Sequence, residues 1–194
     1  MKHLKVLHKF FWKYRLRFSA GVFFIIISNY FGILAPQLTG YVIDKVDNTL
    51  RGQSVVSSDH RIYDRLVYEF ISWVENSSFG FTQIIVLSGL VILGTALLKG
   101  LFMFFMRQTI IVMSRHIEYD QKDEIYRHYQ QLDINFYKTH STGDLMNRIS
   151  EDVSRVRMFT GPAIMYLINL VAVIGFSVFF MFRSNATLTW YVLA

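Results

Sequence analysis

The sequence of 194 residues contains no cysteine, so neither a disulfide framework nor a thiolate metal site is possible. Glu124 and His128 are one helical turn apart but lack a third ligand, and we interpret them as neighbours on a helix surface. Asp120, Asp123 and Glu124 form an acidic cluster that we interpret as a solvated face. We therefore assign the chain no catalytic, cofactor-binding or metal-binding residue.

The phosphate-binding motif G-x-x-x-x-G-K-[ST] is also missing. Without this backbone cradle and its magnesium-binding hydroxyl, we expect that the chain cannot hydrolyse ATP by itself. Nucleic-acid binding is not expected either. The formal net charge of +6 comes from basic residues that flank apolar segments, which leaves no basic stripe for a folded surface.

Long apolar runs dominate what the sequence does contain, since hydrophobic residues make up 53% of it. Three runs exceed the roughly 20 residues that a helix needs to cross a hydrocarbon layer about 30 Å thick. They predict membrane spans at about residues 18–43, 80–106 and 158–182, the first a retained anchor without a cleavage site. A fourth run covers only residues 186–194 and is too short to span. The sequence thus predicts an all-α, polytopic membrane protein.

Lys and Arg are unevenly distributed between these spans. Residues 1–17 carry six and residues 107–157 carry eight, whereas residues 44–75 carry four beside six acidic residues. By the positive-inside rule, we expect the N-terminus and the insert 107–157 in the cytoplasm and the 44–79 connection outside. This outer connection is long, and its sequence indicates no purpose. The expected location is a bacterial inner membrane or another plasma membrane.

The first seventeen residues have the pattern of a basic amphipathic helix. Apolar residues recur at three- and four-residue steps on one face and lysines occupy another: Leu4, Leu7, Phe11, Tyr14 and Phe18 against Lys2, Lys5, Lys9 and Lys13. Such a helix lies in the headgroup plane, with its lysines near anionic phosphates. We expect residues 1–17 to form an interfacial elbow helix. An ordinary basic flank of the first span is the alternative.

The second span is expected to continue as a helix far into the cytoplasm. Its apolar period persists beyond Met106, at Ile110, Met113 and Ile117 and on to Leu132. A helix over residues 81–132 would be about 75 Å long, well over twice the thickness of the hydrocarbon layer. The third span is also expected to begin as helix before its uncharged part.

Turn and capping signals lie between these two helices. Ser141 precedes Asp144 by three residues, the spacing at which a hydroxyl caps a helix start, and Gly143 allows a sharp turn. These signals predict a short helix at residues 141–149. Three of its side chains are expected to pack, namely Leu145, Met146 and Ile149. A solvated turn is the alternative interpretation.

Together these features resemble the N-terminal part of the transmembrane domain of an ATP-binding-cassette (ABC) exporter of the multidrug and lipid type, up to the fourth of six spans. In this family an elbow helix precedes a first span that ends in a pattern like P-x-x-x-G-x-x-I-D, here Pro36, Gly40, Ile43 and Asp44. A histidine, a leucine, an aromatic pair, T-G-D-L-x-x-R and an aspartate follow in the cytoplasmic extension. The matching residues are His128, Leu132, Phe136, Tyr137, Thr142, Gly143, Asp144, Leu145, Arg148 and Asp152.

The resemblance implies a coupling role for the helix at 141–149, seated in a groove of a nucleotide-binding domain. The implied coupling residues are Phe136, Tyr137, Thr142, Gly143, Asp144, Leu145, Arg148 and Asp152. That missing or partner domain would bind ATP and magnesium. A second transmembrane half, in a homodimer or a heterodimer, would complete an export pathway for hydrophobic or amphipathic compounds. The complete family member would be an ATP-hydrolysing translocase.

Two polar residues at membrane depth, Asn29 and Lys99, are candidates for the translocation pathway. Because Lys99 lies eight residues from Arg107, snorkelling toward the cytoplasmic headgroups is the alternative for its side chain. A different function also fits part of the pattern, namely a membrane-anchored sensor or scaffold segment with a cytoplasmic helical stalk. The stalk turns back toward the membrane after residue 143, which favours transport.

Overall fold

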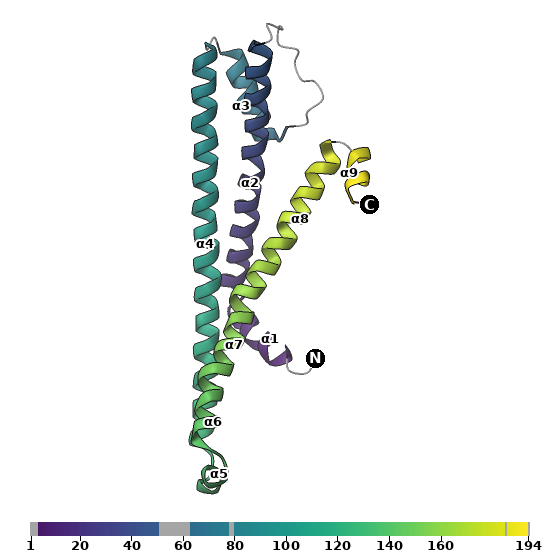
Figure 1. Cartoon of the computed structure of the whole chain (residues 1–194). Coiled ribbons are helices and arrows are strands. Elements are labelled where there is room, and N and C mark those ends of the chain that lie inside the picture. Colours follow the sequence, from purple (N-terminus) through teal and green to yellow (C-terminus); the bar gives the residue numbers. More distant parts are fainter. Residues whose placement is uncertain (1–3, 51–62, 78–79, 185, 194) are drawn as a thin grey trace. The chain divides into compact units, whose positions relative to one another are not determined.

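The computed structural model describes residues 4–50, 63–77, 80–184 and 186–193, and every regular element among them is helical (Figure 1). The elements in chain order are α1 (Leu4–Lys13), α2 (Arg15–Leu50), α3 (Arg65–Asn76), α4 (Phe81–Gln130), α5 (Ile134–Thr139), α6 (Thr142–Asn147), the π-helical turn η1 (Arg148–Asp152), α7 (Val153–Met158), the π-helical turn η2 (Phe159–Ala163), α8 (Ile164–Ser184) and α9 (Ala186–Leu193). The all-α prediction is confirmed.

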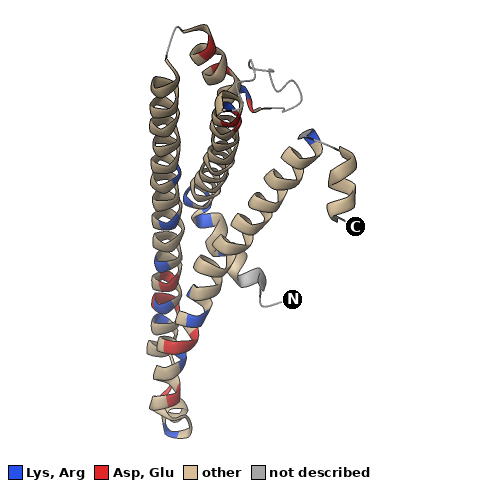
Figure 2. Cartoon of the chain, turned by 45° about the horizontal axis from the view of Figure 1, so that its top comes forward, with Lys and Arg blue, Asp and Glu red and all other residues tan. Residues whose placement is uncertain are grey.

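Three helical segments among the described residues are long and apolar enough to cross a membrane. They are α2, α4 and the continuous run Thr142–Arg183, which extends from α6 through both π-helical turns into α8. These segments contain the residues of the three predicted spans except residue 80, which precedes α4. In Figure 2 the start of α4 and nearly all of α8 are uncharged, whereas charged residues gather in the second half of α4 and around α6 and α7. Lys99 is the one charged residue in the first half of α4.

The helices form two compact units, and the first consists of Met1–Phe24 and Phe104–Leu170. Its core includes the predicted stripe of α4, because Ile110, Met113 and Ile117 are all almost completely buried. α4 ends at Gln130, two residues before the predicted end. η2 contains Pro162, which has no amide hydrogen for the helical ladder. The π-helical turn is a single turn within the longer helical run, the usual form of this rare structure.

The second unit consists of Ile25–Met103 and Val171–Ala194. Its buried cluster joins the second half of α2 to α3 through Leu34, Leu38, Tyr41, Val67 and Ile71. The sequence pattern described residues 44–79 only as a long outer connection, and here the structure differs. α2 continues to Leu50, and α3 is an amphipathic helix that the sequence analysis missed. Residues 51–62 and 78–79 of this connection lie outside the described residues.

Candidate functional site

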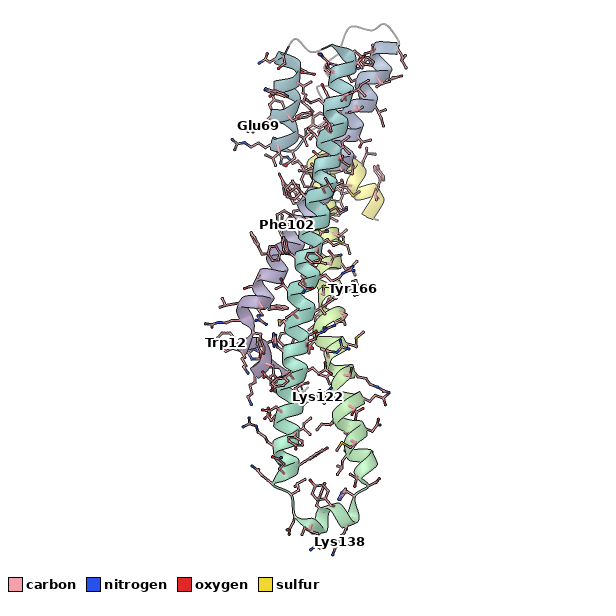
Figure 3. The ribbon with its side chains drawn as sticks, turned by 90° about the vertical axis from the view of Figure 1, so that its left-hand side faces the viewer. Trp12, Glu69, Phe102, Lys122, Lys138 and Tyr166 are labelled. Carbon is pink, nitrogen blue, oxygen red and sulfur yellow. The ribbon has the colours of Figure 1, made fainter. Side chains whose placement is uncertain are left out.

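The short helix α5 stands between α4 and the run that begins at α6, and Lys138 marks its position in Figure 3. None of its residues is buried. Its geometry is nevertheless fixed by local contacts. The Tyr137 hydroxyl donates a hydrogen bond to the carbonyl of Tyr129, at the end of α4, and the rings of Phe136 and His140 stack with centroids 4.1 Å apart. The aromatic pair thus holds α5 in place.

The boundaries of this region differ from those predicted. Residues 141–149 are not a separate short helix, because α6 is the first part of the continuous helical run to Arg183. The separate short helix is α5. Ser141 does stand at the N-cap position, but its side chain makes no capping hydrogen bond. Gly143 lies inside α6 without a left-handed backbone, so no sharp turn requires a glycine there.

The side chains of α6 were predicted only in part. Leu145 is buried, as expected, whereas Met146 was expected to pack and is 57% exposed. Arg148 donates a hydrogen bond to the Asp144 carboxylate over 3.0 Å, an exposed pair one helical turn apart. A contact of this kind contributes little to stability. The motif charges Asp144 and Arg148 therefore remain accessible from outside the chain.

Three residues of the sequence motif line a pocket of the first unit. Arg148 and Asp152 line a pocket of about 740 Å³. The remaining lining residues come from α1, α4 and α7, and they are Leu7, Phe10, Gln121, Glu124, Ile125, His128, Tyr129, Val153 and Val156. The histidine of the sequence motif, His128, thus lies at the same pocket as its arginine and aspartate. Among the described residues, no group of three or more metal-ligating side chains gathers.

The N-terminal helix is attached to α4 by charged side chains. Lys13 lies 2.6 Å from Asp120, and the Tyr14 hydroxyl donates to the same carboxylate over 3.0 Å. Burial opposes the charge of Asp120, but the hydrogen bonds from Lys13 and Tyr14 and the charges of Lys13 and His116 outweigh it and lower the pKa of this carboxyl. Asp120 therefore stays ionised, and the prediction of a solvated acidic face is wrong for it.

The elbow helix predicted at residues 1–17 is present as α1, but it ends at Lys13, because Arg15 already belongs to α2. Its residues Lys9 and Lys13 contact protein. Lys9 lies 3.4 Å from Glu124, beside the Lys13 pair, so two lysines of the predicted basic face point to acids of α4. Phe10, which the pattern did not assign to the apolar face, is buried. Lys2 lies outside the described residues. The interfacial position of α1 stays a prediction.

Both pathway candidates, Asn29 and Lys99, line one pocket of about 600 Å³ in the second unit. Its polar wall also includes Gln37 and Tyr63, which the sequence analysis had not assigned to the pathway. Tyr63 follows a connection without helical or apolar periodicity, so no sequence signal placed it here. The rest of the lining is mostly apolar or glycine, namely Gly32, Ile33, Pro36, Gly40, Val173, Phe176, Ser177, Phe180 and Met181.

The Lys99 side chain extends along α2 and away from Arg107. Its carbonyl accepts a hydrogen bond from the Ser28 hydroxyl over 3.2 Å, whereas its ammonium group lies beside Gly32, four residues further along α2. α2 and α4 are antiparallel here, since the later part of α2 packs beside Val91 and Ile92. The ammonium group therefore points toward the lower numbers of α4. This direction follows the tilt of helical side chains toward the N-terminus of their own helix.

A comparison with protein families matches residues 18–194 to the family described as the ABC transporter transmembrane region. The chain belongs to this family. The match includes α2 from residue 18 onward, α4 and the run from α6 to α8, which are the described segments long enough to span a membrane. The resemblance to an ABC transporter membrane domain that the motifs indicated is therefore confirmed.

Two curated proteins are similar in sequence to this ABC transporter membrane region. It is 24% identical over 194 residues to the uncharacterized ABC transporter ATP-binding protein YknU of Bacillus subtilis, a match that covers 100% of this chain and 28% of the relative. It is 23% identical over 103 residues to an ATP-dependent lipid A-core flippase of Shewanella denitrificans, over 53% of this chain and 17% of the relative. The chain thus spans less than a third of either relative.

The ABC transporter membrane region is accordingly part of a multi-pass membrane protein with a role in transport. Membrane regions of this family pair with nucleotide-binding domains, and the matched family here is that of the membrane region alone. The sensor or scaffold alternative does not explain this match.

Proposed function

We propose that this chain forms the membrane-spanning part of an ATP-driven exporter of hydrophobic or amphipathic compounds, with α5 and α6 as the contact to a nucleotide-binding domain. The observation that carries the proposal is the tip formed by residues 134–149. Ile134 and Met146 are 73% and 57% exposed there, and Tyr137 is also exposed. Apolar side chains exposed together on a segment with a fixed geometry are typical of docking surfaces.

The tip is suited to transmit movement because its two ends continue directly into long helices. α4 has 50 residues and the run from Thr142 to Arg183 has 42, so a displacement of the tip reaches both membrane-spanning segments. Closure of the nucleotide-binding domains on ATP and magnesium would move the tip, and the helices would carry the movement into the pathway. The nucleotide and the metal are bound by the partner domain.

We assign residues to this contact by their exposure at the tip. The tip includes α5 as well as the start of α6, so the docking surface is centred on Ile134, Tyr137 and Met146. Thr142, Gly143 and Asp144 lie beside it on the first turn of α6. Leu145 is buried and supports the surface from within. The ring of Phe136 stabilises the tip by stacking on His140. The adjoining pocket is lined by Arg148 and Asp152.

The remaining parts of the proposal concern assembly and orientation. A second transmembrane half, identical or different, completes the pathway, and the pocket around Asn29 and Lys99 faces that pathway. The protein lies in a bacterial inner membrane or another plasma membrane. Its N-terminus and tip are on the cytoplasmic side, because Lys and Arg are concentrated in residues 1–17 and 107–157. The name of one relative describes a lipid flippase, which supports amphipathic compounds as a substrate class.

The test is ATP-driven transport by the assembled transporter. Inside-out membrane vesicles that contain it are given ATP and an amphipathic fluorescent dye, and uptake is followed over time. We expect uptake with ATP and magnesium that stops when the magnesium is chelated. The control is the same transporter with the lysine of the nucleotide-binding domain's phosphate loop replaced by alanine. Uptake that is equal with and without ATP would contradict an exporter function.

A further inference from the structure

We infer that the pocket around Lys99 binds the anionic headgroup of an amphipathic substrate. The inference rests on the proposed function, because it names the chemical class that the pathway carries. Its starting observation is a charge without a counter-charge: Lys99 lines the pocket, and none of the described residues in the lining is acidic. Among the described residues, the ion pairs of the protein involve other groups than Lys99.

An ammonium group at membrane depth is costly unless it is paired or faces water, and such groups are typical of ion and substrate pathways. Lys99 does not reach toward the headgroups near Arg107, because its Nζ lies beside Gly32 of α2. A Cβ at position 32 would be 3.2 Å from this Nζ, so glycine leaves the room that the ammonium group occupies. α2 and α4 thus present the charge to the pocket.

Hydrogen-bond donors surround the same space. Asn29 and Gln37 of α2 line the pocket about two turns apart, and Tyr63, which precedes the N-cap residue of α3, also lines it. The Tyr63 hydroxyl is buried, and among the described residues it has no hydrogen-bond partner. The Gln37 Oε1 atom accepts the Asp64 amide over 2.8 Å, and the same side chain carries two N–H donors. A phosphate, sulfate or carboxylate oxygen accepts hydrogen bonds from all of these groups.

The part of the lining that α8 supplies is apolar except for Ser177. Val173, Phe176, Phe180 and Met181 form this apolar surface, so an acyl or aromatic part of the ligand packs there while its anionic group meets Lys99. The volume of about 600 Å³ lies within the range of sites for small molecules. A cationic or uncharged ligand would leave the ammonium group without a partner, and this penalty disfavours it.

Equilibrium binding to the assembled transporter in phosphatidylcholine nanodiscs tests the inference. The probes are dodecyl phosphate, dodecyltrimethylammonium and inorganic phosphate. We expect dodecyl phosphate to bind best, and Lys99→Gln to weaken it by about ten- to a hundredfold, the effect of losing one hydrogen bond to a charged group. Lys99→Arg should retain most of the affinity. Lys122→Gln, which removes a lysine of the same helix outside the pocket, should bind as the unchanged protein does.

Three results would overturn the inference. The first is equal binding of dodecyl phosphate and dodecyltrimethylammonium to the unchanged protein, which needs no variant and no refolding control. The second is unchanged binding of dodecyl phosphate to Lys99→Gln. The third is inorganic phosphate that binds as tightly as dodecyl phosphate, which would indicate a free anion as the ligand.

The tests of the anion site and of the exporter function can fail independently. The binding measurement needs no ATP, so charge-selective binding without ATP-driven uptake would support the anion site and contradict the exporter. ATP-driven uptake of dodecyl phosphate that is unaffected by Lys99→Gln would support the exporter and contradict the anion site.

Discussion

Gly161 in η2 and Ser114 in α4 meet at a helix crossing that has no room for another side chain. A Cβ on Gly161 would lie 2.5 Å from the Ser114 Oγ atom and 2.7 Å from its Cβ. Ser114 and the neighbouring Thr160 are both completely buried. Small residues at such crossings let the helix backbones approach closely. The crossing therefore packs α4 against the helical run that leads away from the tip.

Gly161→Ala should lower the melting temperature of the protein in detergent, since overpacking at a tight contact typically costs about 1–3 kcal/mol. Gly175→Ala is the matched control, because a Cβ at that helical position meets no atom within 4 Å. Alanine is the better helix former by roughly 1 kcal/mol, so the control should be neutral or stabilising. Equal shifts for the two variants would mean that the crossing is looser than described. Adding Ser114→Gly to Gly161→Ala should restore part of the loss.

The attachment of α1 to α4 should depend on the ionised Asp120 carboxylate. Because the pKa of this carboxyl is lowered in the folded protein, its contribution is complete above the ordinary aspartate value of about 3.9 and is lost as the pH falls through the lowered value. The distance between spin labels at the exposed positions Trp12 and Tyr119 should stay constant from neutral pH to about pH 4 and increase below it. A transition near neutral pH would contradict this account.

Two substitutions separate the contacts of α1. Asp120→Asn should lengthen the same spin-label distance at every pH, because the carboxylate that binds Lys13 and Tyr14 is mostly buried. Glu124→Gln should have little effect, because both side chains of the Lys9–Glu124 pair are more than half exposed. The reverse order of the two effects would assign the attachment to the outer pair.

The orientation in the membrane is open to a clean test because the chain has no native cysteine. Ser72→Cys, on the exposed side of α3, should react with an impermeant maleimide from outside intact cells. Lys138→Cys, on α5, should react only after permeabilisation. The opposite pattern would place the tip outside the cell, where no nucleotide-binding domain meets it.

Sequence patterns predicted the long elements of this fold well, because their signals are strong and repeated. Some twenty uncharged residues in a row define a span, and the stripe of Ile110, Met113 and Ile117 marked the buried face of α4. α3 is only 12 residues long, and its buried residues Val67, Ile71 and Val74 recur at the four- and three-residue steps of a helix, a signal that the sequence analysis passed over. Its packing against α2 is a tertiary contact that local periodicity does not reveal.

The tip was misplaced for a related reason. The S-T-G-D sequence has the spacing of a capping motif, yet Ser141 forms no capping hydrogen bond and Gly143 has an ordinary helical environment. α5 begins after Asp133, and it is held by contacts of Tyr137 and Phe136 that only the folded chain brings together. The motif residues of α6 nevertheless follow directly after α5, the short helix that was observed. Their spacing indicated the region correctly and its boundaries incorrectly.

The most direct measurement of the coupling proposal is substrate-stimulated ATPase activity together with transport, in the same membranes, for substitutions at the tip. Ile134→Asp places a charge on the exposed docking surface, and Gly143→Val adds bulk where a Cβ would meet only the Ser141 Oγ atom at 3.6 Å. Neither substitution should change the melting temperature greatly. Tyr119→Asp is the control, since Tyr119 is 70% exposed on α4 away from the tip.

We predict that Ile134→Asp and Gly143→Val retain ATP binding and lose both stimulation and transport, by about ten- to a hundredfold if a contact of 1–3 kcal/mol is removed. Tyr119→Asp should keep both activities. If both tip variants transport at the level of the unchanged protein, the tip is only a connection between two helices, and the coupling role proposed for it is wrong.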